Sequence, residues 1–174
     1  MFYYTSSKLD SLAIPIHPLG KSPLIKDNKT IVVESGAIVE YILARYVNGK
    51  LYPDINHVDY ANYLQWVHYA EGSAMPAMMM KYMTHSEAMK PFCDAQFYLH
   101  INYIESSPHG KTWFLGKELS GADIMMSFPL QFTLMLVPTG QFPNIERFIA
   151  QVKSNEYYRK ACERVGELEL KKLA

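Results

Sequence analysis

The chain has 174 residues, 49% hydrophobic and 20% charged, with Lys plus Arg equal to Asp plus Glu at 17 each. This composition excludes a disordered chain, and the balanced charge excludes an overall field that would attract nucleic acid or an acidic membrane surface. The length suits one large or two small packed domains.

Targeting, membrane and metal signals are not evident in the sequence. Residues 1–5 lack a basic region followed by a long apolar stretch, so we expect a cytoplasmic protein without a secretory signal. The longest apolar run, 125–138, is too short to cross about 30 Å of hydrocarbon and predicts a core helix. Cys93 and Cys162 have no CxxC spacing and the histidines have no metal-ligand spacing, which predicts two reduced structural thiols and no metal site.

The first elements in chain order are two short β-rich runs at 22–26 and 30–34. The residues between them, 27–29, include Asp and Asn, which favour tight turns, so the two runs predict a hairpin. Ser35 is expected to cap a following helix, because apolar residues then recur at a spacing of four up to Tyr46.

A polar connector at 48–57 separates this region from a helical one. The chain is therefore divided into a first domain at 1–47 and an all-helical domain at 58–174. Helices are expected in five segments, the first of which carries an aromatic and methionine stripe: 58–83, 87–104, 121–137, 144–153 and 156–173.

The most specific local pattern is a capping box at Ser120 and Asp123, in which each side chain satisfies the other's backbone amide at the head of a helix. By itself this pattern is structural rather than functional. It becomes informative beside three further segments: HPLGKSP at 17–23, ESGAIVEY at 34–41 and WVHYAEGS at 66–73.

Together with LSGADIMMSFPLQ at 119–131, these segments resemble glutathione S-transferases, particularly a fungal-type cytosolic branch. The resemblance runs from about Ile16 to the end of the chain. It implies an α+β fold: a partial thioredoxin-like domain, made of the hairpin and its helix, followed by the all-α C-terminal domain of the family. It also implies glutathione as co-substrate, a small apolar second substrate and a homodimer.

The resemblance implies a glutathione site at five residues. A cis peptide bond before Pro23 would turn the backbone of Ser22 toward open space, where it could pair with the cysteinyl backbone of glutathione. Ser35, at a helix N-terminus, offers a seat for a carboxylate, and the neighbouring Glu34 can meet an ammonium. Since a γ-glutamyl group carries both charges on one carbon, this pair matches it, while Lys21 could reach the glycyl carboxylate.

The aromatic helix has two further expected roles. Tyr69, Met75 and Met79 are assigned to a second-substrate pocket, because methionine-rich surfaces adapt to varied apolar ligands. The same helix, through Tyr63, Trp66 and Tyr69, is expected to lie near the two-fold axis of a homodimer, since it has more apolar surface than one core stripe requires.

The chain departs from the family at its start, because only sixteen residues precede His17, whereas a β-α-β unit needs about 30 or more. Residues 2–4 are either the first strand, with Thr5, Ser6 or Ser7 as the thiol-activating hydroxyl, or the second strand, which is slightly favoured. In the second case the activating segment is absent. The gap is explained either by a segment outside this sequence or by a divergent protein that covers it through dimerisation.

Two classes of function remain open on the sequence. The first is an enzyme that conjugates glutathione to an electrophile or uses it to isomerise a double bond. The second is a binding or scaffold protein that keeps the fold without the chemistry. The intact site residues favour the first class, and the missing activating segment favours the second.

Overall fold

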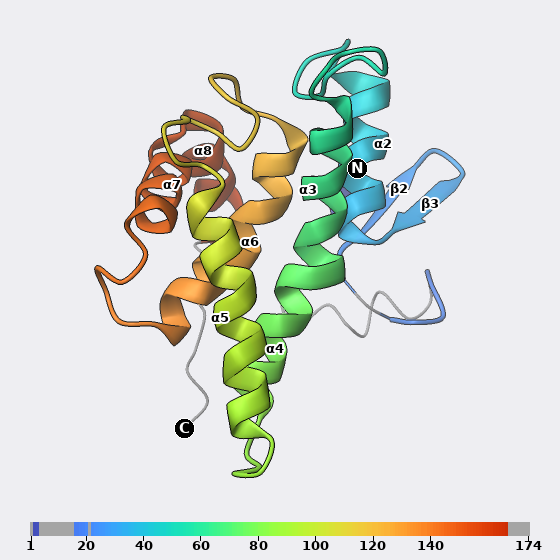
Figure 1. Cartoon of the computed structure of the whole chain (residues 1–174). Helices are drawn as coiled ribbons and strands as arrows, with labels where there is room; N and C mark the ends of the chain where they lie inside the picture. Colours follow the sequence, from blue (N-terminus) through green and yellow to red (C-terminus); the bar gives the residue numbers. More distant parts are fainter. Residues whose placement is uncertain (1, 4–15, 21, 167–174) are drawn as a thin grey trace. The chain divides into compact units, whose positions relative to one another are not determined.

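The structure is a computed structural model that describes residues 2–3, 16–20 and 22–166 (Figure 1). It divides into two compact units, Met1–Gly49 and Lys50–Ala174. The division falls inside the connector at 48–57, between the two domains expected from the sequence. Each unit has its own packing.

The first unit is a small antiparallel sheet with one helix. Its strands β1 (Phe2–Tyr3), β2 (Leu24–Asp27) and β3 (Thr30–Val33) lie in the order β1-β2-β3, and α2 (Ser35–Tyr46) follows. Asp27 pairs with Thr30, so the hairpin turn is only two residues long. The first turn residue, Asn28, has a φ of 54°, a left-handed conformation that Asn tolerates. The predicted hairpin and helix are confirmed.

Asp27, the last residue of β2, ties the hairpin to α2. Its carboxylate accepts a hydrogen bond of 2.8 Å from the Tyr41 hydroxyl and a further one from the Tyr46 hydroxyl. The Nε of Arg45 lies 3.9 Å from the same oxygen. The two tyrosine hydrogen bonds hold the pKa of Asp27 below its usual value of 3.8, with a smaller contribution from Arg45. The ionised form of Asp27 therefore stabilises the packing of α2 against the β2–β3 hairpin.

We expect the Asp27→Asn variant to unfold at a lower temperature than the parent near pH 6, and this difference to shrink in acid. Since the folded-state pKa of Asp27 is lowered, its stabilising effect is full above about pH 3.8 and is lost as the pH falls through the folded-state pKa. Thermal melts of both proteins between about pH 6 and pH 3 measure the difference. A constant difference over that range would show that the charge of Asp27 does not stabilise the fold.

The second unit begins with a long helix that contains one irregular turn. It comprises α3 (Tyr60–Tyr69), a π-helical turn η1 (Ala70–Ala74) and α4 (Met75–Met83). Pro76 has no N–H to donate to the carbonyl four residues earlier, which favours a widened turn just before it. After a short connection α5 (Lys90–Ser106) lies beside α4 (Figure 1). The helix expected at 58–83 thus forms, with this interruption.

The core of the second unit surrounds α6 (Gly121–Leu136), which packs against α3, α4, η1 and α7 (Pro143–Ser154). The final described helix, α8 (Glu156–Val165), packs on α7. The Thr133 hydroxyl donates to the carbonyl of Pro129 at 3.0 Å, so this buried polar group is satisfied inside the helix. The central side chains of α6 are fully buried: Ala122, Met126, Leu130 and Thr133.

These two units confirm the expected fold class: part of a thioredoxin-like domain, then an all-helical domain. Both cysteines are free thiols, with Cys93 buried and Cys162 half-buried. Among the described helices none combines the length and the apolar character needed to cross a membrane.

Candidate functional site

The predicted glutathione-binding residues that the structure describes gather at one end of the β2–β3 hairpin. Leu24 is the register partner of Val33. Ser22 and Pro23 come directly before Leu24, and Glu34 and Ser35 come directly after Val33, so both pairs lie at the end opposite the turn. The Ser22–Pro23 peptide bond is cis, as the sequence analysis anticipated. Ser22, Pro23 and Glu34 are exposed, which leaves this end of the hairpin accessible.

Glu34 has a backbone conformation that the sequence did not reveal. Its φ is 72° and its ψ is 120°, a left-handed region that residues other than glycine rarely adopt. Such a conformation costs on the order of 1–3 kcal/mol and is concentrated at functional sites. Glu is not one of the residue types, such as Gly or Asn, that signal a positive φ in a sequence. Glu34 is one of four non-glycine residues with a positive φ in the described part of the chain, and its role in a glutathione site stays a prediction.

The start of α2 corrects one detail of the sequence analysis. Glu34 occupies the capping position, and Ser35 is the first residue of the helix rather than its cap. The first backbone hydrogen bond of the helix runs from the Ile38 N–H to the Glu34 carbonyl, at 2.9 Å. The amides of the first turn precede this bond and have no partner within the helix, and they carry the positive end of the helix dipole. The half-buried Ser35 hydroxyl stands at this end, where a carboxylate would be stabilised.

Four predicted residues lie outside the described part of the chain. Lys21, assigned to the glycyl carboxylate, is one of them. The other three are the weak candidates for the thiol-activating hydroxyl, Thr5, Ser6 and Ser7. The strand at Phe2–Tyr3 is formed and pairs with β2, and its correspondence to the first or second strand of the complete family fold stays a prediction.

The residues assigned to the second-substrate pocket lie on α3 and α4 of the helical unit. The Tyr69 hydroxyl oxygen is 2.6 Å from Nδ1 of His100 on α5. Burial, with a smaller effect of Tyr103, raises the pKa of Tyr69 to about 12, so its hydroxyl stays protonated at neutral pH. Met75 and Met79 are half-buried, one turn apart on α4. That these three residues share one pocket stays a prediction.

The predicted capping box at the head of α6 is confirmed, and its carboxylate has one more partner than expected. One oxygen of Asp123 accepts from the N–H of Ser120 at 2.8 Å and from its hydroxyl at 2.7 Å. The other oxygen accepts from the N–H of Phe114 at 2.8 Å. Asp123 is 1% exposed, and burial raises the pKa of its carboxyl. It therefore fixes the loop before α6 as well as the helix.

The expected dimer-facing role of two aromatic residues is wrong. Tyr63 is 3% exposed and Trp66 is 6% exposed, because both side chains face the interior of the helical unit. Trp66 lies between Tyr103, with ring centroids 5.4 Å apart, and Phe114, at 4.6 Å. These two side chains are covered by other residues of their own unit, which the sequence pattern alone could not show.

Comparisons with known proteins agree with this architecture. The family model described as the glutathione S-transferase N-terminal domain matches residues 7–44, and the C-terminal domain model matches residues 73–156. Glutathione S-transferase 1 of Saccharomyces cerevisiae is 29% identical, over 88% of this chain and 77% of its own length. Glutathione S-transferase 3 of Schizosaccharomyces pombe is 26% identical, over 92% of this chain and 76% of its own length.

A solved structure extends the agreement to three dimensions. A glutathione S-transferase from Actinobacillus pleuropneumoniae is 32% identical, with a TM-score of 0.80 over 88% of this chain and 73% of its own. The two family models match residues within each of the two units, and this relative is more than 30% identical to the chain. The chain belongs to the glutathione S-transferase family.

Proposed function

We propose that the protein binds glutathione at the hairpin end formed by Ser22, Pro23, Glu34 and Ser35, and conjugates the whole tripeptide, through its sulfur, to a small apolar electrophile. Transient addition of the thiol that isomerises a double bond is the alternative use of the same site. The observation that carries the proposal is the register of β2 and β3, which brings the exposed residues Ser22 and Pro23 and the N-terminus of α2 to the same end of the hairpin.

Different residues at the hairpin end suit different parts of glutathione. The exposed backbone of Ser22 can pair with the cysteinyl residue as an added strand would. The first turn of α2 and the Ser35 hydroxyl suit the γ-glutamyl carboxylate, and the exposed Glu34 suits its ammonium. Lys21 remains the proposed partner of the glycyl carboxylate.

Transfer requires the thiolate of glutathione, because the thiolate is the nucleophile. A hydrogen bond to the sulfur would lower the thiol pKa and raise the thiolate fraction near neutral pH. Thr5, Ser6 and Ser7 remain the candidates for this donor. The second substrate is proposed to meet Tyr69, Met75 and Met79. A cytoplasmic location is part of the proposal, since glutathione and free thiols such as Cys93 are kept reduced there.

Binding and turnover measured on the same preparation test this proposal. We expect calorimetry to detect glutathione binding, and a dinitrophenyl halide to be consumed only when glutathione is present. Binding without turnover on a panel of electrophiles and unsaturated substrates would contradict the transferase and favour the scaffold reading. Absence of binding would contradict the assigned site itself.

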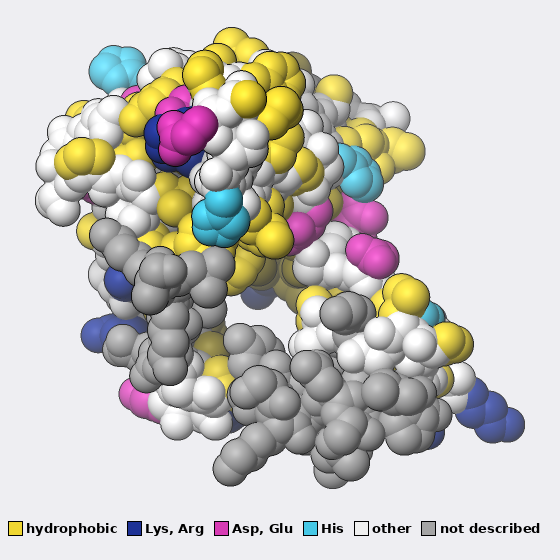
Figure 2. Space-filling model, turned by 90° about the horizontal axis from the view of Figure 1, so that it is seen from below, with side chains coloured by type: hydrophobic (Ala, Val, Ile, Leu, Met, Phe, Trp, Pro, Cys, Tyr) yellow, Lys and Arg dark blue, Asp and Glu magenta, His cyan; other side chains and the backbone are white. Residues whose placement is uncertain are grey.

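We also propose a homodimer, with an interface other than Tyr63 and Trp66. Side chains at the connected ends of α4 and α5 are apolar and exposed: Met80 by 38%, Met83 by 58%, Met89 by 50% and Phe92 by 53%. Figure 2, which views the molecule from below, shows hydrophobic side chains gathered on the helical unit. An exposed patch of this kind is typical of protein interfaces.

We expect light scattering to give about twice the chain mass of 20.0 kDa at micromolar concentration. Since a two-fold contact uses the same patch twice, Phe92→Glu should shift the mass toward the monomer. Tyr157→Glu, on the exposed face of α8, is the matched control and should leave the mass unchanged. A parent protein of 20 kDa under these conditions would contradict the dimer.

A further inference from the structure

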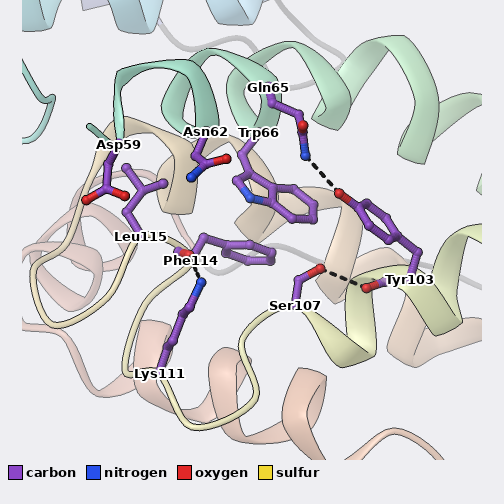
Figure 3. Close-up of a pocket in the computed structure, with 9 residues that line it drawn as sticks. All are labelled: Asp59, Asn62, Gln65, Trp66, Tyr103, Ser107, Lys111, Phe114 and Leu115. Carbon is purple, nitrogen blue, oxygen red and sulfur yellow. Dashed lines mark hydrogen bonds between the residues drawn. The ribbon is translucent and has the colours of Figure 1, made fainter. Parts of the chain in front are cut away.

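The helical unit contains a polar cavity of about 210 Å³ that the proposed transferase function does not use. It lies between the start of α3, the end of α5 and the loop that follows α5 (Figure 3). Its lining includes the carboxylate of Asp59, the amides of Asn62 and Gln65, the ammonium of Lys111 and the indole of Trp66. None of these residues belongs to the glutathione site.

The indole N–H of Trp66 is a buried donor that faces this cavity. The side chain is 6% exposed, and its ring is held by the neighbouring rings of Tyr103 and Phe114. Figure 3 shows the indole nitrogen on the side of the ring that faces Asn62. Within residues 2–3, 16–20 and 22–166, no hydrogen bond to this N–H is formed. Buried donors in native proteins nearly always have a partner, so this one indicates an acceptor that enters the cavity.

A second donor stands on the loop. The Nζ of Lys111 lies 3.5 Å from the Phe114 carbonyl oxygen, the limit of hydrogen-bond distance, so the ammonium keeps capacity for a shorter, charge-assisted partner. The loop itself is fixed, because the Phe114 N–H donates to the buried Asp123 at 2.8 Å. The buried Trp66 ring therefore offers an N–H and the exposed Lys111 offers a cation, a combination that suits a carboxylate.

The cavity is also lined by hydrogen-bond acceptors, one of which is a carboxylate. The Asp59 side chain is 38% exposed, and its Oδ2 is 3.7 Å from Nδ1 of His57. This is not an effective ion pair, because Nδ1 accepts the backbone N–H of Asp59 at 3.1 Å and cannot donate at the same time. Gln65 donates its amide to the Tyr103 hydroxyl at 2.8 Å, which leaves its carbonyl oxygen to accept. Asp59 and Gln65 thus offer acceptors for a cationic group.

We propose that this cavity binds a small zwitterion, an α-amino acid or a dipeptide. Its carboxylate accepts from the Trp66 N–H and the Lys111 ammonium, and its ammonium meets the Asp59 carboxylate. The cavity volume equals roughly seven waters at about 30 Å³ each, which suits a ligand of this size and not a large apolar substrate. The cavity shares no residue with the hairpin end, so a test of zwitterion binding is independent of a test of glutathione conjugation.

The two tryptophans of the chain allow a direct test by NMR of the ¹⁵N-labelled full-length protein. Trp113→Phe identifies the indole signal of Trp66. The protein is titrated separately with glycine, glycylglycine, acetate and methylammonium. The first two probes are zwitterions, and the last two carry a single charge each. We expect the Trp66 indole signal to shift with a zwitterion, at a concentration at least about tenfold below that needed with either single charge, while Trp113 does not respond. The more potent of glycine and glycylglycine identifies the ligand as an amino acid or a dipeptide.

Matched variants assign the contacts. Lys111→Met and Asp59→Asn should each weaken the response about tenfold or more, since each removes one charged partner. Lys153→Met, an exposed lysine in the last turn of α7, should leave the response unchanged. A Trp66 signal that no probe moves would overturn the site. An equal response to acetate and glycine, or full binding by Lys111→Met, would overturn the assignment of a zwitterion.

Discussion

Replacement of Ser35 by alanine is expected to lower the affinity for glutathione about tenfold or more. Ser35 is the first residue of α2, and in the proposed site its hydroxyl and the amides of the first turn hold the γ-glutamyl carboxylate. A hydrogen bond to a charged group contributes roughly 1.5–3 kcal/mol, and each 1.4 kcal/mol corresponds to about a factor of ten in the dissociation constant. Isothermal calorimetry with glutathione measures the change.

Ser22→Ala is the matched control, because the proposed contact of Ser22 uses its backbone and survives loss of the hydroxyl. We expect this variant to bind within about twofold of the parent. Both serines lie at the same end of the hairpin, so a general disturbance of that end would affect both variants. If Ser35→Ala bound glutathione as the parent does, the γ-glutamyl group would have to be placed elsewhere.

The Asp123→Ala variant is expected to lose about 3 kcal/mol of unfolding free energy, more than a single helix cap would account for. The carboxylate accepts from the Phe114 N–H, the Ser120 N–H and the Ser120 hydroxyl, all in a buried environment. Alanine leaves these donors without an acceptor, and an unsatisfied buried donor costs on the order of 1–3 kcal/mol. Denaturant unfolding monitored by circular dichroism measures the loss.

Two further variants separate this effect from a general effect of removing an acid. Asp59→Ala removes the carboxylate at the head of α3, which makes no capping hydrogen bond, and should change the unfolding free energy by less than about 0.5 kcal/mol. Asp123→Asn keeps one acceptor oxygen and carries no charge, so it avoids the burial of a charge that raises the pKa of Asp123, and its stability should be intermediate. Equal stability of Asp123→Ala and the parent would show that the buried network contributes nothing.

The sequence predicted most of the local structure, because local structure here depends on short-range chemistry. The Asp and Asn between the two β-rich runs predicted the hairpin, whose turn is Asn28-Lys29, and the spacing of Ser120 and Asp123 predicted the capping box at the head of α6. Two features of the local backbone were not predicted from the sequence. The proline at 76 brought a π-helical turn into the long helix, and Glu34 adopted a positive φ that no residue type announced.

The tertiary structure decided which face of each helix is buried, and the sequence could not. An aromatic stripe on α3 has the same periodicity whether it meets a partner subunit or the helices of its own unit, and only the packing of Tyr103 and Phe114 against Trp66 shows that it is internal. The polar cavity beside Trp66 could not be predicted from the sequence either. Its lining residues come from α3, from α5 and from the loop that follows α5, which only the tertiary structure brings together. The proposed hairpin-end site could be formulated from the sequence because its two halves flank a single hairpin, and the register of β2 and β3 places them at the same end.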